Sequence, residues 1–222
     1  MKALASINDE ATKWLCKSII AQEPRIGSTN ISDYERVCLI RQWMVRNCPV
    51  ASKGNKLHKW VDNYDEASLG VTFQQFHKGE GGLSCGGLTN LANQLYAQFG
   101  YLATSYNMGV EILNTEPLYS THVVSLVKID HKGSAIFTIQ DALYDFSLEN
   151  KDGSPLSFDH LIDLLISSRA SEVKINSELQ LKRRYIDHKD GSIAEWPQRP
   201  FQDVLGDRIY ATWLSGIFGF TN

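Results

Sequence analysis

A cysteine inside a glycine-rich segment is the residue of this chain best suited to chemistry. Cys85 follows Gly81-Gly82-Leu83-Ser84 and begins a run in which apolar residues recur every three or four positions up to Phe99. This spacing predicts a helix over residues 85–99 that Ser84 can cap, with the thiol in its first turn. The free N–H groups of a helix N-terminus stabilise a thiolate, lowering the cysteine pKa from about 8.5 to roughly 3.5–7.5, and they can also bind an oxyanion. Taken alone, Cys85 is more typical of a small buried thiol that starts a core helix.

Two further residues of the kind that thiol enzymes use come later in the chain. His122 lies at the start of a β-branched stretch, residues 121–129, and Asp141 ends another, residues 135–141, with turn-forming residues between them. If the two strands form a hairpin with a loop of two or four residues, His122 and Asp141 share a face, directly across or on a diagonal. A three-residue loop would put Asp141 on the other face. We favour the even loop because it gathers the apolar residues on that same face, namely Val124, Leu126, Phe137 and Ile139.

In this arrangement each side chain has a defined role. His122 takes the thiol proton of Cys85, Asp141 orients the imidazole and stabilises its cation, and the thiolate attacks a carbonyl carbon. The Cys85 N–H is the first candidate for the oxyanion hole, and Gln74 or Gln75 could add a side-chain amide. The structural alternatives are a polar strand end for His122, a turn residue for Asp141, and the solvent face of a short helix or strand for the two glutamines.

The elements that must position these residues follow from the same kind of pattern. Helices are expected over residues 9–21, 33–47 and 157–168, and a strand over 101–113. Ser32 and Glu35 form a capping-box pattern at the start of the second helix. The expected fold class is α+β, with a central helix carrying the cysteine packed on an antiparallel sheet of at least three strands and with flanking N-terminal helices.

The three candidate segments together resemble a known family. Residues 83–101, LSCGGLTNLANQLYAQFGY, resemble the nucleophile-bearing helix of the transglutaminase-like superfamily of papain-like Cys-His-Asp thiol enzymes. Residues 120–124 resemble the strand that carries the family's histidine, residues 137–141 the strand that ends on its aspartate, and residues 32–48 the helix before the core. The resemblance covers about 33–148. It implies a papain-like core and acyl chemistry on an amide or ester, as peptide-bond hydrolysis, deamidation or transfer to an amine.

Two alternatives to that function remain. An arylamine N-acetyltransferase-like enzyme also uses Cys, His and Asp, and the Gly81-Gly82 pair fits it, but Glu80 stands where an arginine usually precedes the glycines. A catalytically inactive module of the same fold would use its groove to bind a peptide or protein. For the enzyme, the expected substrate is a peptide, a protein or a small amide.

Length and composition set the remaining expectations. The 222 residues suit one domain, with an N-terminal helix in 1–32, the core in 33–148 and an elaboration in 149–222. The chain is 43% hydrophobic and 21% charged, and its net charge of −3 gives no reason to expect a nucleic acid partner. The four cysteines show no zinc spacing, so no metal or cofactor is expected. With no membrane-spanning run and no secretory signal, the expected location is cytoplasmic, and no feature indicates an oligomeric state.

Overall fold

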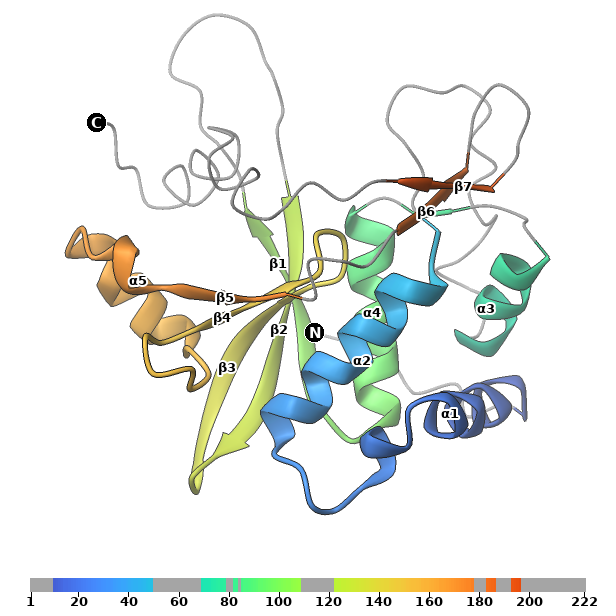
Figure 1. The fold of residues 1–222 in the computed structure, drawn as a ribbon, viewed down its shortest axis with the longest axis horizontal. Coiled ribbons are helices and arrows are strands. Elements are labelled where there is room, and N and C mark those ends of the chain that lie inside the picture. Colours follow the sequence, from blue (N-terminus) through green and yellow to red (C-terminus); the bar gives the residue numbers. More distant parts are fainter. Residues whose placement is uncertain are drawn as a thin grey trace, which may run out of the picture.

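The computed structural model describes residues 10–49, 69–78, 82–83, 85–108, 122–177, 183–186 and 193–196. For residues 107–108, 122, 170, 183–186 and 193–196 the description is confined to the backbone. The fold is α+β, with a five-stranded antiparallel sheet that carries helices on both faces (Figure 1).

The helices are α1 (Glu10–Gln22), α2 (Asp33–Asn47), α3 (Leu69–His77), α4 (Cys85–Gln98) and α5 (Phe158–Ile166), with 3-10 turns at Pro24–Gly27 and Ala170–Glu172. The strands β1 (Ala103–Met108), β2 (His122–His131), β3 (Ser134–Asp141), β4 (Phe146–Glu149) and β5 (Lys174–Asn176) are neighbours in that order. A separate two-stranded sheet pairs β6 (Arg183–Ile186) with β7 (Ile193–Trp196). The structure confirms the four helices and three strands that the sequence patterns predict. Of the strand expected over 101–113, residues 109–113 lie outside the described residues.

Side-chain caps fix the starts of two helices. Ser32 Oγ accepts a hydrogen bond from the Glu35 N–H at 3.1 Å where α2 begins, as the capping pattern predicts. Ser157 Oγ accepts from the His160 N–H at 3.1 Å where α5 begins. The predicted cap of α4, Ser84, lies outside the described residues.

The β2–β3 hairpin closes with a two-residue loop. His131 pairs with Ser134, and Lys132 and Gly133 between them have φ values of 54° and 80°, as a type I′ turn requires. The same register sets Ser125 opposite Gln140, so one step further Val124 lies opposite Asp141. Position 122 therefore shares a face with position 141 on a diagonal. The prediction of an even loop is confirmed.

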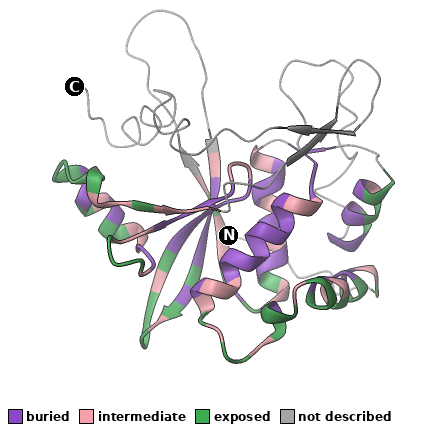
Figure 2. Cartoon of the chain, viewed as in Figure 1, coloured by how far each residue is buried: buried purple, intermediate pink, exposed green. Residues whose placement is uncertain are grey.

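Both faces of the sheet are buried, contrary to our expectation of a single apolar face. Val127 and Ile129 of β2 belong to the core under α2 and α4. Val124 and Leu126 of the same strand belong to a second core under α5. Buried segments lie along the strands of the sheet in Figure 2. Phe137, expected in the core, is 37% exposed. The expectation was wrong because a sheet covered by helices on both sides buries side chains of either parity along each strand.

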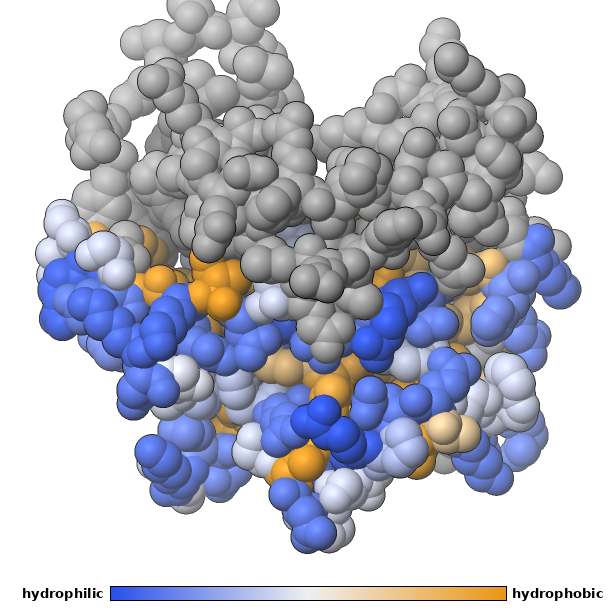
Figure 3. Space-filling view, in the orientation of Figure 1, coloured by the Kyte–Doolittle hydropathy of each residue, from blue (hydrophilic) through white to orange (hydrophobic). Residues whose placement is uncertain are grey.

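Helices α1 and α3 pack against each other on the outer side of α2 and α4 (Figure 1). Their contact is close at Gly70, whose N–H donates to Thr12 Oγ1 at 3.1 Å. A Cβ at position 70 would lie 2.2 Å from the carbonyl carbon of Ala11. Only glycine, which has no Cβ, avoids this overlap. In the part of the chain that the structure describes, no helix is long and apolar enough to cross a membrane. Hydrophilic side chains dominate the described surface in the view of Figure 3.

Candidate functional site

The three predicted catalytic residues come from elements that meet at one end of the main sheet. The chain leaves α4, turns at Gly100 and returns along α4 as β1, so the start of α4 lies near the end of β1. That end of β1 pairs with the start of β2, through Met108 and His122. Strand β3 runs back to the same end and finishes at Asp141 (Figure 1).

One hydrogen bond ties the first turns of α4 to the start of β2. Thr89 Oγ1 donates to the carbonyl oxygen of Val123 at 2.8 Å. Thr89 stands one helical turn after Cys85, and residues four apart lie on the same side of a helix with Cβ atoms about 5–6 Å apart. Val123 directly follows His122. The thiol-bearing turn and the histidine-bearing strand end are therefore neighbours.

The surroundings of Cys85 differ from those of a core thiol. Cys85 is half-buried, whereas Cys38 and Cys48 are buried. Just before it, Leu83 is fully buried and its N–H donates to the Pro49 carbonyl oxygen at 3.2 Å, which anchors the approach to the helix. A Cβ added at Gly86 would meet no atom of the described residues within 4 Å, so none of them covers this side of the first turn of α4.

Asp141 is completely buried, and its carboxylate is held by the turn that follows it. Asp141 Oδ1 accepts hydrogen bonds from the N–H groups of Leu143 at 2.7 Å and Tyr144 at 2.9 Å. Burying a carboxylate is costly unless hydrogen bonds compensate for the lost water, and these two N–H groups supply part of that compensation. The direction of the carboxylate is thereby linked to the shape of the β3–β4 turn.

The phenol group of Tyr144, in that turn, interacts electrostatically with both Asp141 and Cys85. The pKa of Tyr144 is raised to about 12, chiefly by burial and also by the negative charges of Asp141 and Cys85. Both charges therefore lie within electrostatic reach of one phenol group. The β3–β4 turn, with Asp141 at its start, is close to the start of α4.

The faces of the sheet constrain how a catalytic triad can form. Strict alternation along β2 assigns position 122 to the face of Val124, which α5 covers, while α4 lies on the opposite face. A contact between the Cys85 thiol and the His122 imidazole has to form around the end of the sheet, where both elements begin. The structure describes the backbone of His122 and not its side chain.

The two glutamines suggested for the oxyanion hole lie on α3, which the sequence did not distinguish from a strand. Gln74 is exposed and lines an open hollow of about 580 Å³ with Trp14, His77 and Lys78, away from the end of the sheet. Gln75 is half-buried, and its Oε1 is buried without a hydrogen-bond partner among the described residues. The oxyanion role of Gln75 stays a prediction.

A buried arginine beside the β3–β4 turn is the feature that sequence reasoning missed. Arg41 of α2 is fully buried, and its Nε donates to Asp145 Oδ1 at 3.0 Å. Nη1 donates to Gln140 Oε1 at 2.8 Å, and Nη2 to the Asn176 carbonyl oxygen at 3.3 Å. Asp145 is also fully buried, with a left-handed φ of 54°. Removing one partner of such a pair costs about 3–5 kcal/mol because the other charge stays buried.

The network continues from Arg41 toward β4. Arg41 Nη1 lies 3.8 Å from Cys38 Sγ, which lies 3.4 Å from Ser147 Oγ. Ser147 Oγ is 2.8 Å from the Tyr34 hydroxyl, which donates to Glu149 Oε1 at 3.1 Å. Helix α2 is therefore joined to β3, β4 and β5 by polar contacts inside the core.

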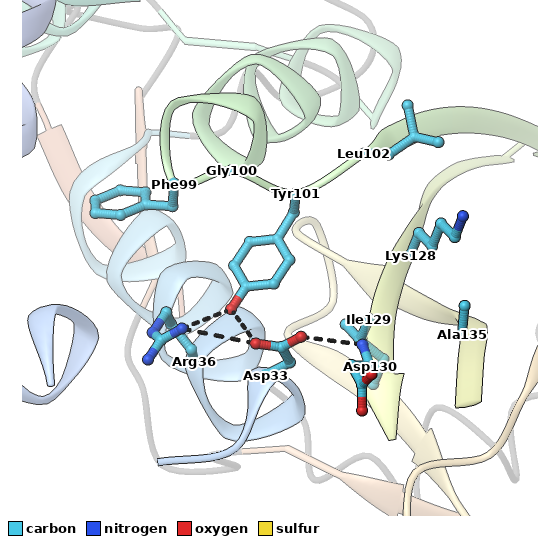
Figure 4. A pocket seen from close by; sticks show the side chains of 10 residues that line it. All are labelled: Asp33, Arg36, Phe99, Gly100, Tyr101, Leu102, Lys128, Ile129, Asp130 and Ala135. Atoms are coloured by element: carbon cyan, nitrogen blue, oxygen red, sulfur yellow. Dashed lines mark hydrogen bonds and ion pairs between the residues drawn. The ribbon is translucent and has the colours of Figure 1, made fainter. Parts of the chain in front are cut away.

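A second pocket of about 430 Å³ lies at the opposite end of the sheet (Figure 4). Its polar side chains bond to one another: Arg36 Nη1 donates to the Tyr101 hydroxyl at 3.0 Å, and that hydroxyl donates to Asp33 Oδ1 at 3.0 Å. Asp33 Oδ2 accepts from the Asp130 N–H at 3.0 Å. These groups hold the start of α2 against the end of β2. Neither Cys85 nor Asp141 is among the described residues that line this pocket. The described residues contain no cluster of three or more His, Cys, Asp or Glu side chains that could hold a metal ion.

Comparisons with known proteins add no family to this geometry. No protein-family model matches the chain, and no curated protein matches it significantly. The chemistry of the site is therefore inferred from its own residues and contacts.

Proposed function

We propose that this protein is a thiol enzyme of the transglutaminase-like kind, with a papain-like core, that acts on an amide or ester through Cys85. The observation that carries the proposal is the hydrogen bond from Thr89 to Val123, because it brings the turn that follows Cys85 against the strand end that begins with His122. The buried Asp141 carboxylate, at the same end of the sheet, supplies the third group.

In the proposed reaction His122 accepts the Cys85 thiol proton and the sulfur attacks the carbonyl carbon. The carbonyl π electrons move to oxygen, and the N–H groups of the first turn of α4 bind the resulting oxyanion. When the oxyanion collapses, the bond to the leaving amine or alcohol breaks, and that group takes the proton from His122. Water or an amine then attacks the thioester, with His122 accepting its proton, and the reaction ends with release of the thiol.

The substrate follows from the same features. A half-exposed thiol beside Gly86, whose side of the helix no described residue covers, suits an acyl group that approaches the helix N-terminus from solvent. The acyl donor is a peptide, a protein or a smaller amide or ester. With water as the acceptor the reaction is hydrolysis or deamidation, and with an amine as the acceptor it is acyl transfer.

The test is the pH dependence of alkylation. The rate of iodoacetamide labelling at Cys85, followed by peptide mass, should reach half its maximum at a pH well below the ordinary thiol pKa of about 8.5. His122→Ala should raise this pH midpoint or abolish the labelling at low pH. Cys16 is an internal control, because burial raises the pKa of its thiol and its midpoint should lie above the ordinary value. His131→Ala, at the other end of β2, is the matched histidine control and should leave Cys85 unchanged.

Acyl chemistry has its own readout. Wild-type protein mixed with p-nitrophenyl acetate should release a burst of p-nitrophenol and gain one acetyl group on the Cys85 peptide, while Cys85→Ala should do neither. If Cys85 labels with an ordinary midpoint that His122→Ala does not move, the enzyme proposal fails and a catalytically inactive binding module of this fold is the better description.

A further inference from the structure

We propose that Arg41 is a positioning residue for the Asp141 carboxylate, acting from the core of α2 through the β3–β4 turn. This inference rests on the proposed function, since it concerns the same catalytic group. Arg41 itself is buried in the interior and acts through the residues that it binds, so it is not a catalytic residue.

The guanidinium holds both sides of the segment that contains Asp141. Gln140, directly before Asp141, accepts from Arg41 Nη1 at 2.8 Å, and Asp145, four residues after it, accepts from Nε at 3.0 Å. The planar fork of arginine fixes these two acceptors relative to each other, which a lysine ammonium cannot do in the same way. Arg41 therefore fixes the separation between Gln140 and Asp145, the two ends of the turn.

The Asp141 carboxylate belongs to the turn between Gln140 and Asp145. Its Oδ1 accepts from the backbone N–H groups of Leu143 and Tyr144, which stand between the two residues that Arg41 holds. Gln140 and Asp145 flank residues 141–144, and the backbone N–H groups of two residues in this segment donate to the carboxylate. A change at Arg41 consequently changes where the carboxylate lies.

The same turn connects Arg41 to the thiol. Tyr144 feels the charges of both Asp141 and Cys85, so this turn is electrostatically coupled to the start of α4. Asp145 holds a left-handed φ of 54°, a conformation that aspartate and asparagine tolerate better than most residues. Loss of the Arg41 contact removes the opposite charge that lies 3.0 Å from the buried Asp145 carboxylate.

The experiment compares labelling midpoints at Cys85 in four variants and in the combination of the first two. The main variant is Arg41→Met combined with Asp145→Asn, which removes the ion pair without leaving a lone buried charge and keeps a residue that tolerates a positive φ. Asp141→Asn is the reference for loss of the carboxylate charge. Arg41→Lys keeps the positive charge and loses the fork. Tyr34→Phe removes the hydrogen bonds that the Tyr34 hydroxyl makes with Ser147 and Glu149, both of which lie outside residues 140–145. This variant is the matched control for destabilisation of the same network.

We expect Asp141→Asn to raise the labelling midpoint, because the His122 cation and the thiolate lose their stabilising charge. The Arg41→Met/Asp145→Asn protein should show a rise of at least half that size, and adding Asp141→Asn to it should give no further rise. Arg41→Lys should give a smaller rise in the same direction, and Tyr34→Phe should keep the wild-type midpoint. Circular dichroism and urea unfolding establish that each variant is folded under the labelling conditions.

A wild-type midpoint in the folded Arg41→Met/Asp145→Asn protein, beside a raised midpoint in Asp141→Asn, would overturn the positioning role and leave the proposed function standing. If the Arg41→Met/Asp145→Asn protein does not fold, Arg41→Lys takes its place: a wild-type midpoint in Arg41→Lys would likewise overturn the positioning role. If neither Asp141→Asn nor His122→Ala moves the midpoint, the proposed function itself is wrong, and the positioning role falls with it.

Discussion

Replacing Gly70 by alanine should destabilise the protein, although alanine is the better helix former. The new Cβ would lie 2.2 Å from the carbonyl carbon of Ala11 and 2.4 Å from the Thr12 nitrogen. Both are backbone atoms, so no side-chain rotation relieves the contact. Helix α1 has to move away from α3 by more than about 1 Å to restore an ordinary van der Waals distance.

The size of the effect follows from what α1 buries. Leu15 and Ile19 are 2% and 0% exposed, and burying each is worth about 1.5–3 kcal/mol. The hydrogen bond between the Gly70 N–H and Thr12 Oγ1 adds about 1 kcal/mol. Against this loss, alanine gains up to about 1 kcal/mol in helix propensity. If α1 separates from α3, the free energy of unfolding should fall by about 3–6 kcal/mol.

Urea unfolding measures this difference directly. With a slope of about 3 kcal/mol/M for a chain of this size, the midpoint of Gly70→Ala should fall by about 1–2 M. Gly86→Ala is the matched control, because it also places alanine for glycine in a helix but its Cβ meets no atom within 4 Å in the described part of the chain. Its midpoint should stay level or rise. A Gly70→Ala midpoint that rises as Gly86→Ala does would refute the close packing of α1 on α3.

Two further changes test the hairpin and the buried phenols. Lys132→Asn should stabilise the protein by about 0.5–1 kcal/mol in thermal unfolding, because asparagine tolerates the left-handed φ of 54°, and a loss of stability would contradict the type I′ turn. Burial raises the pKa of Tyr144 and Tyr101 to about 12, so the native state keeps protons that unfolded tyrosines lose near pH 10. Stability should therefore decline as pH rises between about 10 and 12, and Tyr144→Phe should make the decline shallower; a flat urea midpoint over this interval would contradict the burial of these groups.

Local patterns in the sequence were enough for the elements of the site. The three- and four-residue spacing after Cys85 gives α4, which ends at Gln98, and the turn chemistry of Lys132-Gly133 with flanking β-branched residues gives the β2–β3 hairpin. These features depend on residues close in the chain, so periodicity and turn preferences capture them.

The second buried face and the Arg41 network could not be predicted in this way. Phe137 looks like a core residue beside Ile139, but burial of a strand residue depends on which helices cover each face, and α5 begins only at Phe158. Arg41 is an ordinary surface residue by its type, and its acceptors Gln140 and Asp145 lie 99 and 104 residues away. No local pattern indicates such a partner. The approach of the predicted site residues to one end of the sheet is likewise a property of the topology.

The sequence separation of the Arg41 contacts also sets an order of events during folding. The β2–β3 hairpin closes over two residues, whereas Arg41 meets Asp145 and Asn176 only when 104 and 135 residues of chain have been brought together. Closing long loops costs entropy that local contacts do not, so the hairpin and helices can form while the guanidinium is still hydrated. During synthesis α2 leaves the ribosome well before β4 and β5 exist. We therefore expect the polar core to form late, and interactions that form after the folding barrier chiefly slow unfolding.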